Sequence, residues 1–421
     1  MRILLVSEDL PTPGMGGLAR HTLALARALM ALGHQVDLMG NDDYPPELAE
    51  GQLSSDAFSG QFFAELRGQF EGWKEMQLGV FMPPKRSFIA RRFARAIMKR
   101  ASYYDVIHYH GHLPNIASYL PARLNFIQTR HDQGSDCLIH TRFKRGSICK
   151  RIDPAACAEC RTWNPNALQQ YVSMLAVRRF RQEVMQGFAR HKTVFVSDFL
   201  RRNLARSLGT QLRGFTLHNF IDSAALQSAR DAVPHPVLHF VPSGPLQVFI
   251  AAKLYPAKGV FSFLSALDAY PHDMLHISIA GDGREQTSLR ERFPWVHFHG
   301  WQSGAQTLQL AARAHAIVVP SVCEEACAST VLEGLLLGKT VFALRLGGTP
   351  ELSQYASVPG QLKLFDDLAS LAQALVEQAQ QAPAPDIRIA PHVRADAHHA
   401  AARLVDLYRL PPGPLHLPDL P

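Results

Sequence analysis

The chain has 421 residues, of which 47% are hydrophobic and 19% are charged, and its net charge is +7. This length and composition are typical of a globular protein with two domains of roughly 200 residues each. The sequence has no apolar run of about 18 residues, so no transmembrane helix is predicted. Residues 1–215 carry a net charge of +11 and residues 216–421 carry −4. A basic half is suited to an anionic membrane or to nucleic acid, but motifs typical of nucleic-acid binding are absent and no such partner is expected.

The chain begins with a pattern typical of a βαβ unit. Residues 2–7 predict a strand, residues 21–32 an amphipathic helix and residues 35–39 a second strand. The glycine-rich loop before the helix contains Gly16 and Gly17. Glycines here let the backbone approach a phosphate or a sugar, and a plain tight turn is the alternative. The short apolar run and early acids are unlike a signal peptide, so we expect a cytoplasmic protein.

A strongly basic segment follows at residues 85–100, with seven basic residues and no acid. Helical periodicity places Ile89, Phe93 and Ile97 on one face. The other face carries Arg91, Arg92, Arg95 and Lys99. Such a helix can lie on an anionic membrane, where each basic residue contributes about 1 kcal/mol. The alternative is an ordinary domain helix with a solvated cationic face.

Histidines follow two of the predicted strands in the first half. Residues 104–109 precede His110 and His112. Residues 126–129 precede His131. The carboxyl ends of strands line the ligand-binding edge of an open α/β sheet, so these imidazoles are candidates for a site. A purely structural role is the alternative for any one of them.

Four cysteines come next, at Cys137, Cys149, Cys157 and Cys160. A cytosolic chain seldom keeps disulfides, so four clustered thiols predict a tetrahedral structural zinc site. Only the Cys157–Cys160 spacing is that of a standard metal-binding pair. Reduced, unpaired thiols and disulfides are therefore the alternatives.

The second half of the chain also alternates strands and helices. Residues 246–252 predict a strand, and the loop after it carries Lys253 and Lys258. Residues 275–280 predict another strand, which ends at Gly281. Two cations in such a loop fit a bound diphosphate, because fixed positive charge stabilises a phosphate leaving group. A pair of solvated surface lysines is the alternative.

The most informative stretch is 318–351. It predicts a strand, a loop, a helix over residues 328–337, a strand over residues 340–344 and a Gly-Gly turn. Glu325 and Glu333 lie near the helix with seven residues between them. Two carboxylates at a helix start can accept paired hydrogen bonds from a polyhydroxyl ligand. Acids are also favoured near a helix N-terminus without any ligand.

This stretch resembles the Glu-x7-Glu signature of the family 4 retaining glycosyltransferases, which have the GT-B fold. The matching residues are Pro320, Ser321, Glu325, Glu333, Gly338, Val341, Gly347, Gly348, Pro350 and Glu351. Other segments resemble the family in the same order along residues 1–360: 11–17, 131–132, 215–222, 253–259, 281–283 and 295–300. One departure is Ala326, Cys327 and Ala328, where the family has Gly-Phe-Gly.

The resemblance implies two Rossmann-like domains that face a central crevice. Residues 1–215 would form the N-terminal, acceptor-side domain, and residues 216–395 the nucleotide-sugar-binding domain. Residues 396–421 would provide a helix that crosses back to the first domain and a proline-rich tail. The implied reaction is retaining sugar transfer from a nucleotide-sugar to an acceptor hydroxyl, without a catalytic metal.

By the same resemblance, roles fall on particular residues. The implied catalytic residues are His131, Lys253, Lys258 and Glu325. The residues implied to bind the donor are Gly16, Gly17, Lys253, Lys258, Gly281, Glu325 and Glu333. The lysines would hold the diphosphate, Glu325 the sugar hydroxyls and Glu333 the ribose. His131 would support the sugar from the first domain.

The expected donor is a UDP- or GDP-sugar. The basic first half favours an acceptor in lipopolysaccharide or surface-polysaccharide assembly, and peripheral association with the inner face of the plasma membrane. Two alternatives stay open: a GT-B nucleotide-sugar 2-epimerase, and a non-catalytic donor-binding partner of another transferase. The Ala326–Cys327–Ala328 departure motivates the second of these.

Overall fold

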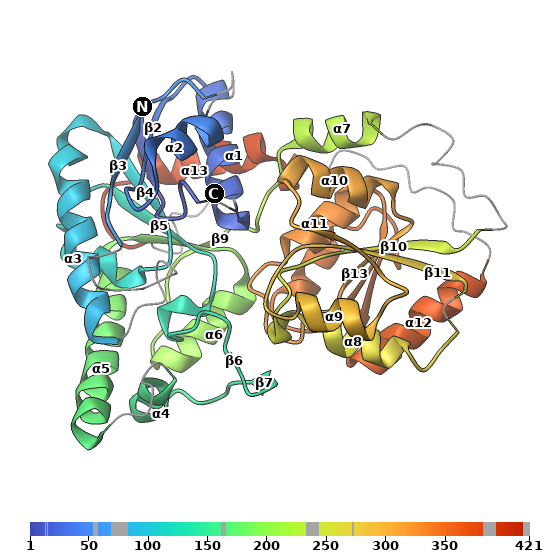
Figure 1. Cartoon of the computed structure of the whole chain (residues 1–421). Helices are drawn as coiled ribbons and strands as arrows, with labels where there is room; N and C mark the ends of the chain where they lie inside the picture. Colours follow the sequence, from blue (N-terminus) through green and yellow to red (C-terminus); the bar gives the residue numbers. More distant parts are fainter. Residues whose placement is uncertain are drawn as a thin grey trace. The chain divides into compact units, whose positions relative to one another are not determined.

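The computed structural model describes residues 1–12, 14, 16–53, 58–68, 83–160, 166–232, 244–271, 273–381 and 393–415. Residues 416–421 of the predicted proline-rich tail lie outside this part of the chain. The chain divides into two compact units. Unit 1 consists of Met1–Arg142, Cys149–His218 and Ala397–Pro421, and unit 2 of Phe143–Ile148 and Asn219–Asp396. Both units are α/β, as the alternation of strands and helices predicts (Figure 1).

Unit 1 is built on a seven-stranded parallel sheet with the order β3-β2-β1-β4-β5-β8-β9. Its strands are β1 (Arg2–Val6), β2 (Gln35–Asn41), β3 (Phe62–Leu66), β4 (Val106–His110), β5 (Phe126–Arg130), β8 (Lys192–Phe195) and β9 (Phe215–Thr216). Every residue of β4 and β5 is buried, as expected for central parallel strands with both faces covered. The strand ends therefore place polar residues at defined edges of a rigid sheet.

Helices surround this sheet. They are α1 (Gly17–Ala31), α2 (Pro46–Leu53), α3 (Pro83–Arg100), α4 (Pro154–Glu159), α5 (Ala167–Arg190), α6 (Asp198–Leu208) and α13 (Ala397–Arg409). Short 3₁₀ turns are η1 (Ala101–Tyr103), η2 (Pro114–Tyr119) and η3 (Gln133–Ser135). The hydroxyl of Ser197 caps α6 by accepting from the Leu200 amide, and Gly209 ends that helix in the left-handed conformation.

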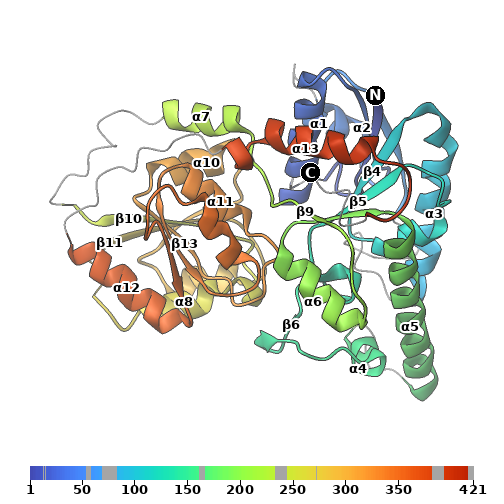
Figure 2. The ribbon, with the colours of Figure 1, turned by 180° about the vertical axis from the view of Figure 1, so that it is seen from behind.

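The last helix is an integral part of unit 1. Helix α13 packs against α1, as both views of the ribbon show (Figure 2). The Tyr408 hydroxyl lies 2.7 Å from His108 Nδ1, and Asn125 Nδ2 donates to the Tyr408 carbonyl at 2.9 Å. Lys192 Nζ donates to the Leu410 carbonyl at 2.6 Å. Polar contacts thus fasten α13 to the buried strands β4 and β8.

Unit 2 contains a six-stranded parallel sheet with the order β12-β11-β10-β13-β14-β15. Its strands are β10 (Leu246–Ala251), β11 (Leu275–Ala280), β12 (His297–Gly300), β13 (Ala316–Val319), β14 (Thr340–Leu344) and β15 (Leu362–Phe365). Its helices and 3₁₀ turns are α7 (Ser223–Asp231), η5 (Pro256–Lys258), α8 (Val260–Leu267), α9 (Gln286–Arg292), α10 (Gly304–Arg313), α11 (Ser329–Leu336), η6 (Thr349–Tyr355), α12 (Leu368–Gln380) and η7 (Val393–Ala395). A two-stranded hairpin, β6 (Phe143–Lys144) with β7 (Ser147–Ile148), also belongs to this unit.

The predicted elements agree with the observed ones to within a few residues. Helix α1 begins earlier than the predicted residue 21, because the chain turns helical directly after Gly16. Helix α11 begins at Ser329 and β14 spans Thr340–Leu344, close to the predicted 328–337 and 340–344. Within the described ranges, no helix combines the length and the apolar character needed to cross a bilayer.

Candidate functional site

The loops after β10, β11, β13 and β14 meet at the carboxyl edge of the unit 2 sheet. Gly281, directly after β11, has φ +142°, and a β-carbon there would lie 1.8 Å from the Ala252 carbonyl oxygen. Gly347, after β14, has φ +61°, and its β-carbon would lie 2.3 Å from the Glu325 carbonyl oxygen. Glycine is required at both positions, because other residues would be strained and would clash. The close approach brings the four loops into one surface.

An ion pair joins two of these loops. Lys258 Nζ contacts Glu325 Oε1, and the Ser321 hydroxyl donates to the same oxygen at 2.7 Å. The loops are also tied by backbone bonds, because the amides of Val322 and Cys323 both donate to the Ala257 carbonyl, at 3.1 and 3.2 Å. Two residues that are 67 positions apart in the sequence, both predicted as catalytic, are thus brought into contact.

Both members of this pair are held in their charged forms. Burial alone would raise the pKa of Glu325, but the Lys258 charge and the hydrogen bonds from Lys258 and Ser321 outweigh it, so that pKa is lowered. Burial alone would lower the pKa of Lys258, but Glu325 raises it above its ordinary value. An ammonium and a carboxylate are therefore both available to a ligand at neutral pH.

The other residues predicted in this half lie on the same loops or next to them. Lys253 is exposed and follows β10 by two residues. Glu333 is half-buried on α11, which begins one turn earlier at Ser329. Gly281 donates its amide to the Gly300 carbonyl at the end of β12 at 2.8 Å. The roles of Lys253 and Glu333 in donor binding stay predictions.

Asn219 is a neighbour of this loop that the sequence did not single out. Its side-chain amide donates to the Cys327 carbonyl at 2.9 Å and to the Ser329 hydroxyl at 3.3 Å. Its backbone amide donates to the Cys327 thiol sulfur at 3.4 Å. Ala326, Cys327 and Ala328, which replace the family's Gly-Phe-Gly, are all buried. A sequence signal existed only as the resemblance of residues 215–222 to the family linker.

In unit 1, His131 lies among other histidines at the carboxyl ends of β4 and β5. Its Nε2 is 3.0 Å from Nδ1 of His110, and its ring centre is 4.7 Å from that of His21 on α1. Burial lowers the pKa of His131, with a smaller contribution from His21, and lowers the pKa of His21 to about 3. These imidazoles are neutral at pH 7 and can donate or accept a hydrogen bond. The sequence pointed to His131 but not to His21.

Gly16 and Gly17 lie at the start of α1. Gly16 caps the helix, its carbonyl accepts from the Arg20 amide at 3.1 Å, and its backbone is extended. A β-carbon at either glycine would have no atom within 4 Å. Nothing in the described backbone therefore requires glycine, and open space on that side suits a ligand as well as a turn. Their predicted contact with the donor stays a prediction.

The four predicted zinc cysteines are all free thiols, and of these Cys157 lies on α4 and Cys160 directly follows it. Burial raises the pKa of Cys157, Arg181 opposes this, and the nearby Cys160 and Cys149 raise it further. Arg181 also donates to the Cys157 sulfur at 3.2 Å. Burial raises the pKa of Cys137 to about 11. Within the described part of the chain, no three of these thiols form a group whose ligand atoms all lie within 4.8 Å of one another, and the zinc site stays a prediction.

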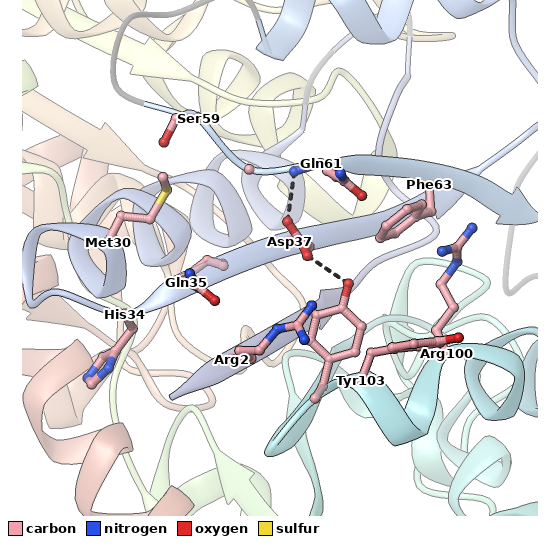
Figure 3. Close-up of a pocket in the computed structure, with 13 residues that line it drawn as sticks. Arg2, Met30, His34, Gln35, Asp37, Ser59, Gln61, Phe63, Arg100 and Tyr103 are labelled. Carbon is pink, nitrogen blue, oxygen red and sulfur yellow. Dashed lines mark hydrogen bonds between the residues drawn. The ribbon is translucent and has the colours of Figure 1, made fainter.

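A cavity of about 550 Å³ lies at the opposite, amino edge of the unit 1 sheet (Figure 3). Asp37 on β2 accepts hydrogen bonds there from the Tyr104 hydroxyl at 2.7 Å and from the Gln61 amide at 2.8 Å. Arg2 lies over the Tyr104 ring and Arg100 over the Phe63 ring. The carboxylate and the aromatic rings that line the cavity therefore already contact other residues of the lining. None of the predicted site residues lines this cavity.

Comparisons with solved structures define the class of the protein. A glycosyltransferase from Rickettsia africae aligns with a TM-score of 0.59 at 16% identity, covering 97% of both chains. Sucrose-phosphate synthase from Thermosynechococcus elongatus aligns with a TM-score of 0.61 at 16% identity, covering 97% of this chain and 94% of that one. HepE from Anabaena, solved with UDP-glucose, aligns with a TM-score of 0.53 at 17% identity, covering 96% and 94%. The protein has two α/β units, each with a parallel sheet, and it has the GT-B fold of these glycosyltransferases.

Two family models match the chain. Residues 15–225 match the model of Glycosyltransferase Family 4, and residues 245–381 match that of Glycosyl transferases group 1. The chain therefore belongs to glycosyltransferase family 4. A search of curated proteins finds no match to it.

Proposed function

We propose that the protein transfers a sugar from a nucleotide-sugar to an acceptor hydroxyl with retention of the anomeric configuration. The observation that carries this proposal is the charged Lys258–Glu325 pair at the carboxyl edge of the unit 2 sheet. A nucleotide-sugar presents a diphosphate and sugar hydroxyls side by side. A cation and a carboxylate in contact offer a partner to each of these groups.

In the proposed reaction the acceptor oxygen bonds to the anomeric carbon on the face that the phosphate leaves. The carbon–oxygen bond to the phosphate breaks, and the departing phosphate oxygen takes the acceptor proton. Lys258 and Lys253 neutralise the leaving nucleoside diphosphate, so the step needs no divalent metal. Glu325 binds donor-sugar hydroxyls, Glu333 the ribose, and His131 supports the sugar.

The proposed donor is a UDP- or GDP-sugar. Support for UDP comes from the similar fold of Anabaena HepE, which was solved in complex with UDP and with UDP-glucose.

The proposed acceptor is a lipid-linked glycan or lipopolysaccharide core at the inner face of the plasma membrane. The basic face of α3 supports this, because Arg91, Arg95 and Lys99 are exposed there, together with the apolar side chains of Phe88 and Met98. Cations flanked by exposed apolar side chains are the combination that binds an anionic membrane surface.

A labelling experiment separates this proposal from its alternatives. The purified protein is incubated with a sugar-labelled nucleotide-sugar and an inner-membrane lipid extract. Transfer predicts that the label enters the lipid-linked fraction, and the anomeric configuration of the new linkage tests retention. Label that stays in a chemically altered nucleotide-sugar would indicate the 2-epimerase. Donor that binds but is never consumed would indicate the non-catalytic partner.

A further inference from the structure

A second polar cluster in unit 1 consists of His112, Asp132 and His140. His112 follows β4, Asp132 follows β5, and His140 lies in the loop after η3. Asp132 Oδ2 is 2.9 Å from His112 Nδ1 and 3.1 Å from His140 Nδ1. The potential ligand atoms of the three residues all lie within 4.8 Å of one another. We propose that they bind a divalent first-row transition metal of the zinc type.

The donor set and its spacing fit such an ion. Two imidazoles and one carboxylate form a common protein site for zinc and related metals, with one position left open. Ligand atoms about 2.0–2.1 Å from a tetrahedral zinc are about 3.3 Å apart. The 2.9 and 3.1 Å separations therefore need to widen by only a few tenths of an ångström to admit the ion.

Atoms that face away from the cluster hold two of the three ligands in place. His112 Nε2 lies 3.3 Å from Asp9 Oδ1, and the His112 amide donates to Glu8 Oε1 at 2.6 Å. The other oxygen of Asp132, Oδ1, accepts from the Gly134 amide at 2.7 Å. Metal-binding histidines usually donate their second nitrogen to a carboxylate in this way, which orients the ring and raises its basicity.

The third ligand, His140, occupies a constrained position. It has φ +64°, in the left-handed region that residues with a β-carbon seldom adopt. Its amide donates to the Cys137 carbonyl, and its carbonyl accepts from the Gln133 amide, both at 3.2 Å. A β-carbon at Gly134 would lie 2.3 Å from His140 Nδ1 and 2.6 Å from Asp132 Oδ1. The loop is thus shaped to admit this imidazole beside the carboxylate.

In this position the metal acts as a clip rather than a reactant. It joins the segment after β4 to the loop after β5, and Asp132 directly follows His131. The ion would fix the backbone that carries His131, and no step of sugar transfer is assigned to it. The alternative occupant is a proton, with one charged imidazole bridging Asp9 and Asp132.

The test uses the full chain, purified without a histidine tag and stripped with a chelator. Zinc binding is measured by titration calorimetry, and Co²⁺ is used as an optical probe of the ligands. Cobalt bound by nitrogen and oxygen gives visible bands without the intense thiolate charge-transfer absorption. That absorption would mark a site built from the four cysteines. The clip predicts one equivalent of cobalt with nitrogen and oxygen ligands.

Variants assign the site. His140→Gln should lower the affinity for this equivalent of cobalt at least tenfold. His299→Gln in unit 2 is the matched control and should leave the affinity unchanged. Asp9→Asn keeps all three ligands and should lower the metal affinity about 10- to 100-fold. This variant tests the site if His140→Gln does not fold. Thiolate-type spectra alone, no bound metal, or unchanged affinity in a folded His140→Gln or Asp9→Asn variant would overturn the proposal. Nucleotide takes no part, so the result is independent of the proposed transferase reaction.

Discussion

At the scale of single residues, Lys258 and Glu325 hold each other in position before any ligand is bound. Lys258 contacts Glu325 Oε1, and Ser321 donates to the same oxygen. In the proposed reaction, the cation assigned to the donor diphosphate is thus already held in position, which would lower the cost of reorganisation during transfer.

Lys258→Ala tests this charge directly. We expect turnover to fall by about 10²-fold or more, because one fixed charge beside the leaving diphosphate is lost. Release of nucleoside diphosphate in the presence of acceptor is the measurement. Lys363→Ala is the matched control, since Lys363 lies on β15 and bonds to Gln378. Normal turnover in a folded Lys258→Ala variant would refute the assignment.

A second residue-scale prediction concerns acid stability. His191 is buried in unit 1, and burial lowers its pKa to about 4, although hydrogen bonds to the Leu120 and Ala117 backbone oppose this. Below the ordinary pKa of 6.5 the unfolded chain binds a proton that the folded chain does not, so stability falls as the pH drops from 6.5 towards 4. This residue alone should remove about 2 kcal/mol of unfolding free energy between pH 7 and pH 5.

Thermal unfolding at several pH values measures this effect. His191→Gln should flatten the pH dependence of the unit 1 transition between pH 7 and pH 5. His297→Gln is the control, because His297 is an exposed residue of unit 2. An unchanged slope in His191→Gln would show that the buried imidazole does not contribute to acid sensitivity.

Asn219 provides a third test, which depends on the proposed function. Its side chain holds the Cys327 carbonyl and so the buried Ala326–Ala328 loop next to Glu325. Asn219→Ala loses this hydrogen bond, which is worth about 1 kcal/mol. The variant should raise the KM for the donor about fivefold, with a smaller effect on kcat. Ser329→Ala removes only the longer contact and should change the KM less. Steady-state kinetics with equal effects of both variants on KM would contradict this role.

At the scale of elements, helix α3 buries the apolar face that its sequence predicts, together with one cation that the pattern does not predict to be buried. Its buried face includes Ile89, Phe93 and Ile97, as the periodicity predicted. Arg86, however, is completely buried, where it donates to the Leu138 carbonyl at 2.8 Å and stacks over Phe180. Burial of a cation within a predicted cationic segment depends on a partner 52 residues away, which no local pattern contains.

Charge reversal on α3 tests membrane association. Changing Arg91, Arg92 and Arg95 to Glu should abolish sedimentation with anionic vesicles, because each basic residue contributes about 1 kcal/mol at such a surface. A control with the same charge change replaces exposed cations of unit 2: Arg284, Arg313 and Arg345. Unchanged sedimentation of the α3 variant, or an equal loss in the control, would contradict specific binding through α3.

Local patterns predicted most of the secondary structure, but not the contacts between loops. Apolar periodicity located α11 and β14 to within one or two residues. The contact of Lys258 with Glu325 spans 67 positions and depends on the order of the parallel strands. The approach of His21 to His131 depends in the same way on α1 packing over the sheet. Family resemblance identified both Lys258 and Glu325 but only His131 of the second pair, and the fold supplied His21 and both contacts.

At the scale of the whole molecule, the chain forms two α/β units, each built on a parallel sheet. Each unit is made of more than one segment of the sequence. Residues Ala397–Pro421 return to unit 1, where α13 packs against α1, while the hairpin Phe143–Ile148 belongs to unit 2. The charge is also distributed unevenly between the two halves of the sequence, because the excess of basic residues lies in residues 1–215. This arrangement gives each unit its own strand edge with its own polar cluster.

The most direct test of the account is calorimetric titration of the pure protein with UDP, GDP, ADP and their sugar conjugates. We predict that one nucleotide binds with a Kd near 1 μM, about −8 kcal/mol, and that Glu333→Ala abolishes this binding. Glu377→Ala is the matched control and should bind normally, because Glu377 is exposed on α12 and bonds to Gln373. Such a result would identify the base and support the donor site. Binding of no nucleotide at all would contradict the proposed donor site and leave the family relationship supporting the fold alone.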